Sequence, residues 1–334
     1  MDIHKLEEWY INNHRKLSFR ETKNPYHIWV SEVMLQQTQV DTVLSYFERF
    51  INEFPTVKDL ALVAEEELMK HVEGLGYYRR FRNMQKAAQE IVSRFDGVFP
   101  DTYEDIISLP GIGRYTAGAI MSIAYQKPYS ALDGNVIRVL SRYLGDDRDM
   151  RSEKHKKDLD QINQKYIEHA HPEIYTQAMM ELGATLCRPK NPKCEECPLV
   201  SHCVAYAEDR QDQLPLLSKL KEQKNINFIT LIIEDNDYYY LRKRDEELLK
   251  GMYEYPQFQS ESIYSVEDEL FGQSIVVRIS EESHKYKHVF SHQVWMMEVH
   301  RAKLIKGINP FWTKICKTDL HTIPMAIAHR KIKA

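Results

Sequence analysis

Four cysteines are crowded into one short segment of this 334-residue chain, which otherwise contains only Cys316. Their spacing is C-x6-C-x2-C-x5-C, and the residues are Cys187, Cys194, Cys197 and Cys203. Cysteine thiolates are soft ligands that suit zinc or an iron–sulfur cluster, so this spacing predicts a metal site. Two disulfides and a chance grouping are the alternatives. The six-residue gap contains two prolines and is wide for a zinc knuckle, which favours a cluster over zinc.

The start of the chain and its composition bound the class of protein. Residues 1–8 are polar and charged, unlike a secretory signal, so we expect no oxidising compartment. Hydrophobic residues make up 43% of the chain and charged residues 28%, which is ordinary for a soluble protein of about two domains. No apolar run approaches the ~20 residues that a membrane span needs.

The charge balance leaves nucleic-acid binding open. The net charge is −4, which gives no global basic signature. Binding to nucleic acid needs only a local positive face. Such a face is available beside Tyr77 and Tyr78, where four cations stand close together in the sequence: Arg79, Arg80, Arg82 and Lys86.

The sequence pattern changes from helical to strand-rich after about residue 207. Residues 1–207 have a helical pattern, including one long amphipathic helix over 26–50 and a helix from Val136 that ends at Gly145. A polar stretch over 208–225 is interpreted as a linker. After it, β-branched and aromatic runs predict strands at 227–233, 238–242, 274–279 and 288–300, with a helix at 265–271. We therefore expect an all-α domain (1–207) followed by an α+β domain (226–334).

A Pro-Gly-Ile-Gly turn with Gly111 and Gly113 is the second strong motif. Asp101 and Glu104 form a capping box for a short helix ending near Ser108, and a second helix follows over 115–125. Glycines let the backbone approach a ligand closely, and the N–H groups of the new helix attract a phosphate. The pattern predicts a helix–hairpin–helix over 101–125 that grips a DNA strand through its backbone. A plain helix hairpin with a glycine-rich corner is the alternative.

Two isolated acids are candidate catalytic groups. Asp133 precedes the helix that begins at Val136, and we expect the helix terminus to keep its carboxylate ionised in a partly buried pocket. Glu32 stands in the mostly apolar first half of the long helix, where a buried carboxyl tends to take up a proton, as a general acid requires. Each residue alone also fits a plainer role, Asp133 as a helix cap and Glu32 as an exposed helix-face acid.

Together these features resemble the endonuclease III superfamily of DNA glycosylases, over residues 20–205. Three stretches are similar to the adenine DNA glycosylases (the MutY family) within it: Ser31–Val40, Gly74–Tyr78 and Ala131–Asn135. That family excises adenine mispaired with 8-oxoguanine. Residues 288–295 are similar to the loop by which the family senses 8-oxoguanine. Around Gly251–Pro256 the C-terminal domain resembles a Nudix fold, without the acidic pairs that hold magnesium in Nudix hydrolases.

The resemblance implies a role for each matched residue. Glu32 would protonate the flipped adenine, Asp133 would stabilise the cationic sugar or attack it, and Tyr115 and Asn135 would orient these groups. The other implied contacts are with adenine (Arg20 and Gln177), with the gap in the base stack (Gln37, Thr38, Leu75 and Tyr77), with 8-oxoguanine (Phe290, Ser291 and His292) and with the DNA backbone (Gly111 and Gly113). The four cysteines would ligate a [4Fe–4S] cluster, with Arg188, Lys190 and Lys193 in its first loop facing phosphates.

One position bears on the type of reaction. Bifunctional relatives carry a lysine where this chain has Tyr115, and a phenol cannot form the Schiff base that strand cleavage requires. The resemblance therefore implies a monofunctional enzyme that leaves an abasic site. One departure from the family is Ser18-Phe19-Arg20, where Pro-Trp-Arg is expected, so a wall of the adenine pocket changes but stays aromatic.

The alternatives belong to other classes of protein. A bifunctional glycosylase–lyase would need the missing lysine, and a non-catalytic DNA-binding or redox-sensing protein would not need both acids. A thymine or uracil mismatch glycosylase shares the tyrosine but usually lacks the C-terminal domain. We expect a monomer that binds double-stranded DNA with an A:8-oxoguanine or A:G mismatch, cytoplasmic and nucleoid-associated in a bacterium, with no membrane partner.

Overall fold

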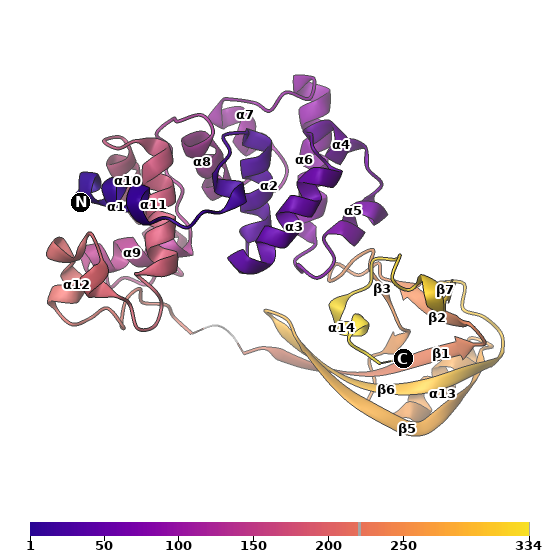
Figure 1. The fold of residues 1–334 in the computed structure, drawn as a ribbon. Helices are drawn as coiled ribbons and strands as arrows, with labels where there is room; N and C mark the ends of the chain where they lie inside the picture. The colour runs from indigo at the N-terminus through magenta and orange to yellow at the C-terminus, as the bar shows by residue number, and fades with distance from the viewer. Residues whose placement is uncertain (220–221, 334) are drawn as a thin grey trace. The chain divides into compact units, whose positions relative to one another are not determined.

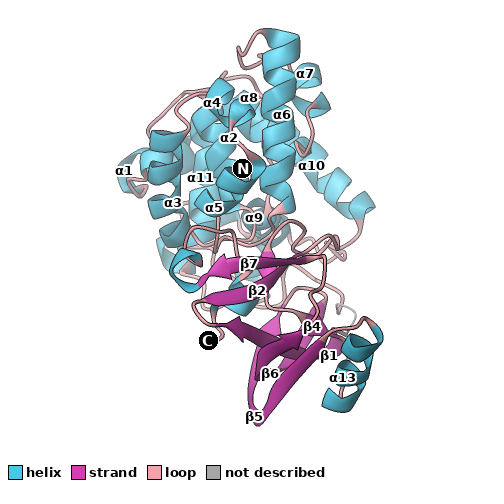
Figure 2. Ribbon diagram, turned by 90° about the vertical axis from the view of Figure 1, so that its right-hand side faces the viewer, coloured by secondary structure: helices cyan, strands magenta, loops and turns pink. Residues whose placement is uncertain are grey.

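The computed structural model describes residues 1–219 and 222–333, and the chain forms two compact units. Unit 1 contains Met1–Leu62 and Arg82–Lys219, and unit 2 contains Val63–Phe81 and Leu220–Ala334. Unit 1 is helical and unit 2 is built around a mixed sheet, as the colours of Figure 2 show. The predicted order, an all-α domain followed by an α+β domain, is confirmed.

Unit 1 is organised around α11 (Pro172–Thr185), which packs against several other helices of the unit (Figure 1). Among them are α1 (Ile3–Asn13), α8 (Arg114–Ile123), α9 (Gly134–Leu144) and α10 (Glu153–Ile167). Its buried side chains include Tyr175 and Leu182, so α11 contributes to the core along much of its length. The other elements are η1 (Ser18–Arg20), α2 (Pro25–Leu35), α3 (Val40–Glu53), α4 (Val57–Leu62), α7 (Tyr103–Ser108), η2 (Cys194–Glu196), η3 (Val200–His202) and α12 (Val204–Ala207); α6 (Arg79–Phe95) begins in unit 2 and continues into unit 1.

The single long helix predicted over 26–50 is wrong, because the chain breaks between α2 and α3. The break falls at residues 36–39, where Gln37 has a left-handed backbone with φ of 58°. A left-handed residue cannot continue an α-helix, so the polar run turns the chain away from the axis of α2. Apolar residues stand on both sides of the break and neither glycine nor proline marks it, which is why the pattern did not reveal it.

The helix–hairpin–helix consists of α7, the turn at 109–113 and α8. Its capping box lies one residue later than predicted, since the side chain of Thr102 accepts a hydrogen bond from Asp105 N. In the turn, Gly111 has φ of 79°, and a Cβ there would lie 2.6 Å from the Cβ of Asn83. Glycine suits this position for two reasons: it adopts the left-handed backbone readily, and it has no Cβ to clash with Asn83.

The stretch that follows the cysteines is partly docked on unit 1. Leu214 is buried, and its carbonyl oxygen accepts a hydrogen bond from Arg142 Nε at 2.9 Å. Arg151 Nε donates to the carbonyl oxygen of Ser218 at 2.6 Å. Within the stretch interpreted as a linker (208–225), residues 220 and 221 lie outside the described part of the chain, and the first strand of unit 2 begins at Lys224.

Unit 2 is built on a sheet with the strand order β3-β2-β1-β6-β5, shown in magenta in Figure 2. Its long central strand β1 (Lys224–Asp235) pairs in parallel with β6 (Gln293–Lys306) and antiparallel with β2 (Tyr238–Lys243). Alternate residues of β1 face opposite sides, so Leu231 packs with α13 (Ile263–Gly272) while Ile232 belongs to the other hydrophobic cluster. The remaining elements are α5 (Glu65–His71), β3 (Tyr253–Glu254), β4 (Gln257–Phe258), β5 (Val276–Val289), β7 (Trp312–Cys316), η4 (Lys317–Asp319) and α14 (Ile327–Arg330).

The predicted strand over 288–300 is divided by a turn. β5 ends at Val289 and β6 begins at Gln293, so residues 290–292 form the tip of a long antiparallel hairpin. The run of β-branched and aromatic residues on both sides of Ser291 concealed the reversal. Along the described residues, no helix combines the length and apolar character required to cross a membrane.

Candidate active site and cysteine loop

A cavity of about 660 Å³ in unit 1 brings together most of the predicted site residues. It is bordered by η1, the end of α2, the break that follows α2, the hairpin turn, the start of α9 and one face of α11. The predicted residues that line it are Arg20, Glu32, Gln37, Thr38, Gly111, Gly113, Tyr115, Asp133, Asn135 and Gln177. The other predicted contacts, Leu75, Tyr77, Phe290, Ser291 and His292, belong to unit 2.

Glu32 is buried at the wall of this cavity, with only 1% of its surface exposed. The hydroxyl of Tyr115 donates a hydrogen bond to Glu32 Oε2. Arg20 Nη1 lies 3.2 Å from Oε1, close enough for an ion pair but without hydrogen-bond geometry. Within residues 1–219 and 222–333, no group donates a hydrogen bond to Oε1, which leaves this oxygen available to a molecule in the cavity.

Tyr115 occupies the position that bears on the type of reaction. Burial raises its pKa well above the ordinary value, and the nearby carboxylates of Glu32 and Asp133 raise it further. The phenol is therefore held in its neutral form, in which it donates a proton to a hydrogen bond. It serves here as a fixed donor to Glu32.

Asp133 is the N-cap of α9, as the plainer sequence interpretation had it. Its Oδ1 accepts a hydrogen bond from Val136 N at 2.7 Å, and its Oδ2 accepts one from Asn135 Nδ2 at 2.9 Å. Burial nevertheless raises the pKa of Asp133, while these hydrogen bonds and the charge of Arg138 oppose the rise. The expectation that the helix terminus keeps this carboxylate ionised stays a prediction, because the hydrogen bond from Val136 N favours the charged form while desolvation opposes it.

Arg138 is a residue that sequence reasoning missed. Its Nη2 donates to Asn135 Oδ1 at 2.8 Å and to the carbonyl oxygen of Gly183 at 2.7 Å, and its Nε donates to the carbonyl oxygen of Cys187 at 2.7 Å. It thus connects the start of α9 to α11 and to the first cysteine. Its signal in the sequence was a pair of arginines one helical turn apart, Arg138 and Arg142, on an otherwise apolar helix.

The four cysteines line one small cavity of about 30 Å³ beside α9. Burial raises the pKa of Cys197 to about 12, and neighbouring cysteines add to the rise. Thiols so placed become thiolates only if a cation binds them, so this donor set fits an iron–sulfur cluster. Arg142 braces the loop, because its Nη1 donates to the carbonyl oxygen of Arg188 at 2.7 Å and lies 3.4 Å from Cys187 Sγ.

The basic side chains predicted to face phosphates differ in their exposure and in whether they already have a partner within the protein. In the cysteine loop, Arg188 Nη2 donates to the carbonyl oxygen of Asn191 at 2.8 Å, and Lys193 pairs with Glu196 at 3.1 Å. Lys190 is exposed. Arg80, predicted as part of a surface patch, is buried, and burial lowers its pKa to about 10. A buried guanidinium cannot reach a phosphate, so the predicted positive face does not include Arg80.

In unit 2, the predicted contact residues lie on two turns. Leu75 is buried, whereas Tyr77 is 47% exposed and has φ of 48°. At the tip of the β5–β6 hairpin, Phe290 packs against Trp295 with ring centroids 4.8 Å apart. Ser291 and His292 are exposed, and Ser291 Oγ lies 3.4 Å from His292 Nδ1.

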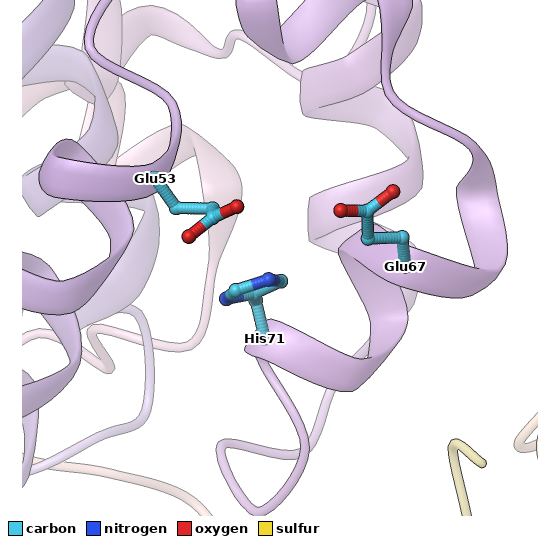
Figure 3. Close-up of side chains that lie close together, drawn as sticks. All are labelled: Glu53, Glu67 and His71. Carbon is cyan, nitrogen blue, oxygen red and sulfur yellow. The ribbon is translucent and has the colours of Figure 1, made fainter. Parts of the chain in front are cut away.

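A second group of possible metal ligands is much weaker than the cysteines. Glu67 and His71 stand one turn apart on α5, with a carboxylate oxygen and a ring nitrogen within 4.8 Å; Figure 3 draws them together with Glu53 of α3. Glu67 is exposed and His71 is half-buried. Exposed acidic groups of this kind are common without an ion, so we assign no metal to them.

Three family models match successive parts of the chain. Residues 30–168 match the HhH-GPD superfamily base excision DNA repair protein, and residues 187–203 match the iron-sulfur binding domain of endonuclease III. Residues 229–334 match the NUDIX domain. These matches confirm the helix–hairpin–helix domain and the Nudix-like domain, and with the four cysteines they establish a [4Fe–4S] cluster as the cofactor.

Solved structures of related enzymes share the fold of unit 1. A thermostable thymine-DNA glycosylase superposes with a TM-score of 0.57 at 24% identity, covering 62% of this chain and 95% of that one. An endonuclease III in a non-covalent complex with DNA superposes with a TM-score of 0.53 at 25% identity, covering 62% and 94%. That endonuclease III is therefore a DNA-bound protein with the fold of unit 1.

Curated relatives share one name. An adenine DNA glycosylase of Buchnera aphidicola subsp. Acyrthosiphon pisum (strain APS) is 35% identical over 289 residues, which cover 85% of this chain and 82% of the relative. The human adenine DNA glycosylase is 42% identical over 218 residues, which cover 63% and 40%. The chain is a DNA glycosylase that hydrolyses N-glycosidic bonds, and it belongs to the adenine DNA glycosylase family.

Proposed function

We propose that this enzyme removes adenine mispaired with 8-oxoguanine, or with guanine, by hydrolysis alone. The observation that carries the proposal is a pair of buried oxygens that lack hydrogen-bond partners in the described chain, Glu32 Oε1 and Gln177 Oε1. Both residues line the 660 Å³ cavity, which would receive a flipped base. Buried polar atoms without partners are rare, so this pair supports a ligand with several hydrogen-bonding groups, as adenine has.

Glu32 is the proposed proton donor. Protonation of a ring nitrogen of adenine turns a poor leaving group into a good one, and Oε1 is the oxygen free to deliver the proton. Tyr115 fixes the other oxygen of the carboxyl group by its hydrogen bond, so the group cannot rotate away. Arg20 and Gln177 border the same space and would hold the edge of the base.

Asp133 is the proposed partner of the cationic sugar. As the bond to adenine breaks, positive charge develops on the sugar, and a nearby carboxylate stabilises it or bonds to it transiently. Asn135 and Val136 N hold both oxygens of Asp133, which fixes its direction before the substrate arrives. Water then completes the reaction.

Because Tyr115 offers no amine, the enzyme is proposed to leave the DNA strand intact. The expected product is an abasic site that breaks only on heating or in alkali, with little adduct trapped by borohydride. Tyr115→Lys places an amine beside the sugar and should create some trapping, whereas Tyr115→Phe should create none. Efficient strand cleavage by the wild type would show that another lysine acts as a nucleophile.

Recognition of the opposite base is assigned to unit 2. Adenine is a normal base, so the cavity around Glu32 cannot separate a wrong adenine from a right one. At the hairpin tip, Ser291 offers both a donor and an acceptor, which suits the 8-oxo group and the N7 hydrogen that distinguish 8-oxoguanine from guanine. Phe290 and His292 stand on either side of it and would contact the duplex.

A substrate panel tests the proposal. Single-turnover excision is measured on otherwise identical duplexes carrying A opposite 8-oxoguanine, A opposite guanine, and T opposite guanine. We expect the fastest release of adenine opposite 8-oxoguanine, slower release opposite guanine, and no release of thymine. Faster release of thymine than of adenine would contradict the proposal.

A further inference from the structure

The segment that carries Asp133 into the active site has no regular secondary structure. It joins α8 to α9 over residues 126–132 and ends at the catalytic aspartate proposed above. Segments without regular secondary structure are the parts of a fold whose position varies most. Something outside the segment must therefore hold it if Asp133 is to have a fixed place.

Ser130 is held by side chains of α10 at both its backbone and its hydroxyl. Its Oγ donates to Asp160 Oδ1 at 2.6 Å and accepts from Asn163 Nδ2 at 2.8 Å. Its backbone N–H donates to Gln164 Oε1 at 2.9 Å, and Gln164 Nε2 donates in turn to the carbonyl oxygen of Pro128 at 2.6 Å. Three polar side chains on one face of α10 thus form hydrogen bonds with the same serine.

The α10 side of this contact is itself fixed. Asn163 is 2% exposed, and its Oδ1 accepts a hydrogen bond from the hydroxyl of Tyr175 at 2.8 Å. Tyr175 lies on α11 and is 1% exposed. Asn163 and Tyr175 are therefore fixed, because movement of either would leave a buried polar group unpaired.

The other side of the segment is pressed against the helix–hairpin–helix. A Cβ at Gly118 of α8 would lie 1.9 Å from the carbonyl oxygen of Ser130, so the two backbones are in direct contact. The ring of Tyr129 stacks on Tyr103 of α7, with centroids 4.6 Å apart and planes at 4°. The segment is therefore clamped between α10 and the hairpin.

We propose that Ser130 is a positioning residue for Asp133, acting through its hydrogen bonds to Asp160, Asn163 and Gln164. Only Ala131 and Leu132 separate Ser130 from Asp133, and Ala131 is buried. A displacement of Ser130 should therefore also displace Asp133. The inference rests on the proposed role of Asp133. Rate is sensitive to such shifts, since a misplacement of about 1 Å can cost about a hundredfold.

The test compares three alanine substitutions in the full-length enzyme. Ser130→Ala and Asn163→Ala each remove the bond between Asn163 and the hydroxyl of Ser130. Ser141→Ala is the matched control, because Ser141 is a buried serine of α9 whose hydroxyl has no partner in the described chain. The readouts are the single-turnover rate constant, the dissociation constant for the same duplex, and the fraction of active enzyme from the burst amplitude.

We expect Ser130→Ala to lower the rate constant about tenfold, with unchanged DNA affinity and unchanged active fraction. Asn163→Ala should have a similar effect, the double variant should be no slower than the slower single variant, and Ser141→Ala should match the wild type. A wild-type rate constant in Ser130→Ala overturns the proposal, as does a loss confined to affinity or active fraction. The excision rates of the wild type on A:8-oxoguanine, A:G and T:G duplexes test the proposed function separately. The variants are then compared on the duplex that the wild type cleaves fastest.

Discussion

The cavity of unit 1 and the hairpin tip of unit 2 hold their proposed functional side chains in opposite ways. Glu32, Tyr115 and Asp133 are each held by neighbouring groups of unit 1. Ser291 and His292 are exposed, and their side chains contact each other. Proton transfer and charge stabilisation need groups fixed before the substrate arrives, whereas recognition can be completed by the substrate itself. We therefore assign base excision to the held side chains of unit 1 and recognition of the opposite base to the exposed side chains of unit 2.

The largest effect should come from the cysteine loop, which Arg142 of α9 contacts. Cys197→Ser removes a ligand of the cluster, so folding energy coupled to the metal is lost and soluble protein should fall sharply. Cys316→Ser is the control, since Cys316 lies in unit 2. Metal analysis of the wild type should find iron. Stoichiometric zinc without iron would contradict this picture.

The next largest effect concerns the fixed acids. Glu32→Gln and Asp133→Asn keep the size of each side chain and remove its acid chemistry, so each should slow excision by about a hundredfold or more. Mismatch binding should persist, because neither change alters the shape of the cavity. Gel-shift affinity and single-turnover rate are measured on the same duplex. Normal turnover by either variant would refute its assigned role.

A smaller effect is expected at the exposed hairpin tip. Changing Phe290, Ser291 and His292 together to alanine should lower the preference for 8-oxoguanine over guanine by about ten- to a hundredfold, the worth of a few hydrogen bonds. Removal of residues 226–334 should do the same, while cleavage of A opposite guanine survives. The matched control changes Ser280, Glu281 and Glu282 to alanine, on the same hairpin away from its tip. If that control lowers selectivity equally, the tip has no special role.

The last predicted effect is a pH dependence of stability in unit 2, which is separate from excision. Burial raises the pKa of Glu254, but His329, Arg244 and Arg242 outweigh burial and hold it at about 2, against an ordinary value of 4.5. Because the folded pKa is depressed, its contribution of about 3 kcal/mol is complete above pH 4.5 and is lost as pH falls toward 2. Denaturant titrations of the wild type between these values should show that loss. Glu254→Gln should flatten it, and an unchanged slope would contradict the assignment.

Local motifs were predictable from the sequence where a residue type is tied to one role. The cysteine spacing, the glycine turn and the cap at Asp133 all depend on contacts within a few residues, so the sequence contains them. The end of α9 at Gly145 was equally local, since glycine favours the left-handed cap that is observed.

What the sequence did not reveal depends on contacts between distant segments. The break at Gln37 lies between two helices, and its polar side chains line the cavity together with residues more than a hundred positions away. The same holds for Arg138, which reaches Gly183 and Cys187, and for Ser130, which is held from α10. Periodicity records which face of a helix is buried, but not which polar group it meets.

We propose that unit 1 carries out base excision and that the hairpin tip of unit 2 recognises the opposite base. Duplex binding by a variant that cannot excise adenine tests this division most directly. Equilibrium affinity for A:8-oxoguanine and A:G duplexes is compared for Glu32→Gln and for the same variant carrying the alanine changes at Phe290, Ser291 and His292. We predict that Glu32→Gln still prefers 8-oxoguanine and that the combined variant loses most of this preference. A preference that survives the combined changes, or that is already absent in Glu32→Gln, would contradict this division.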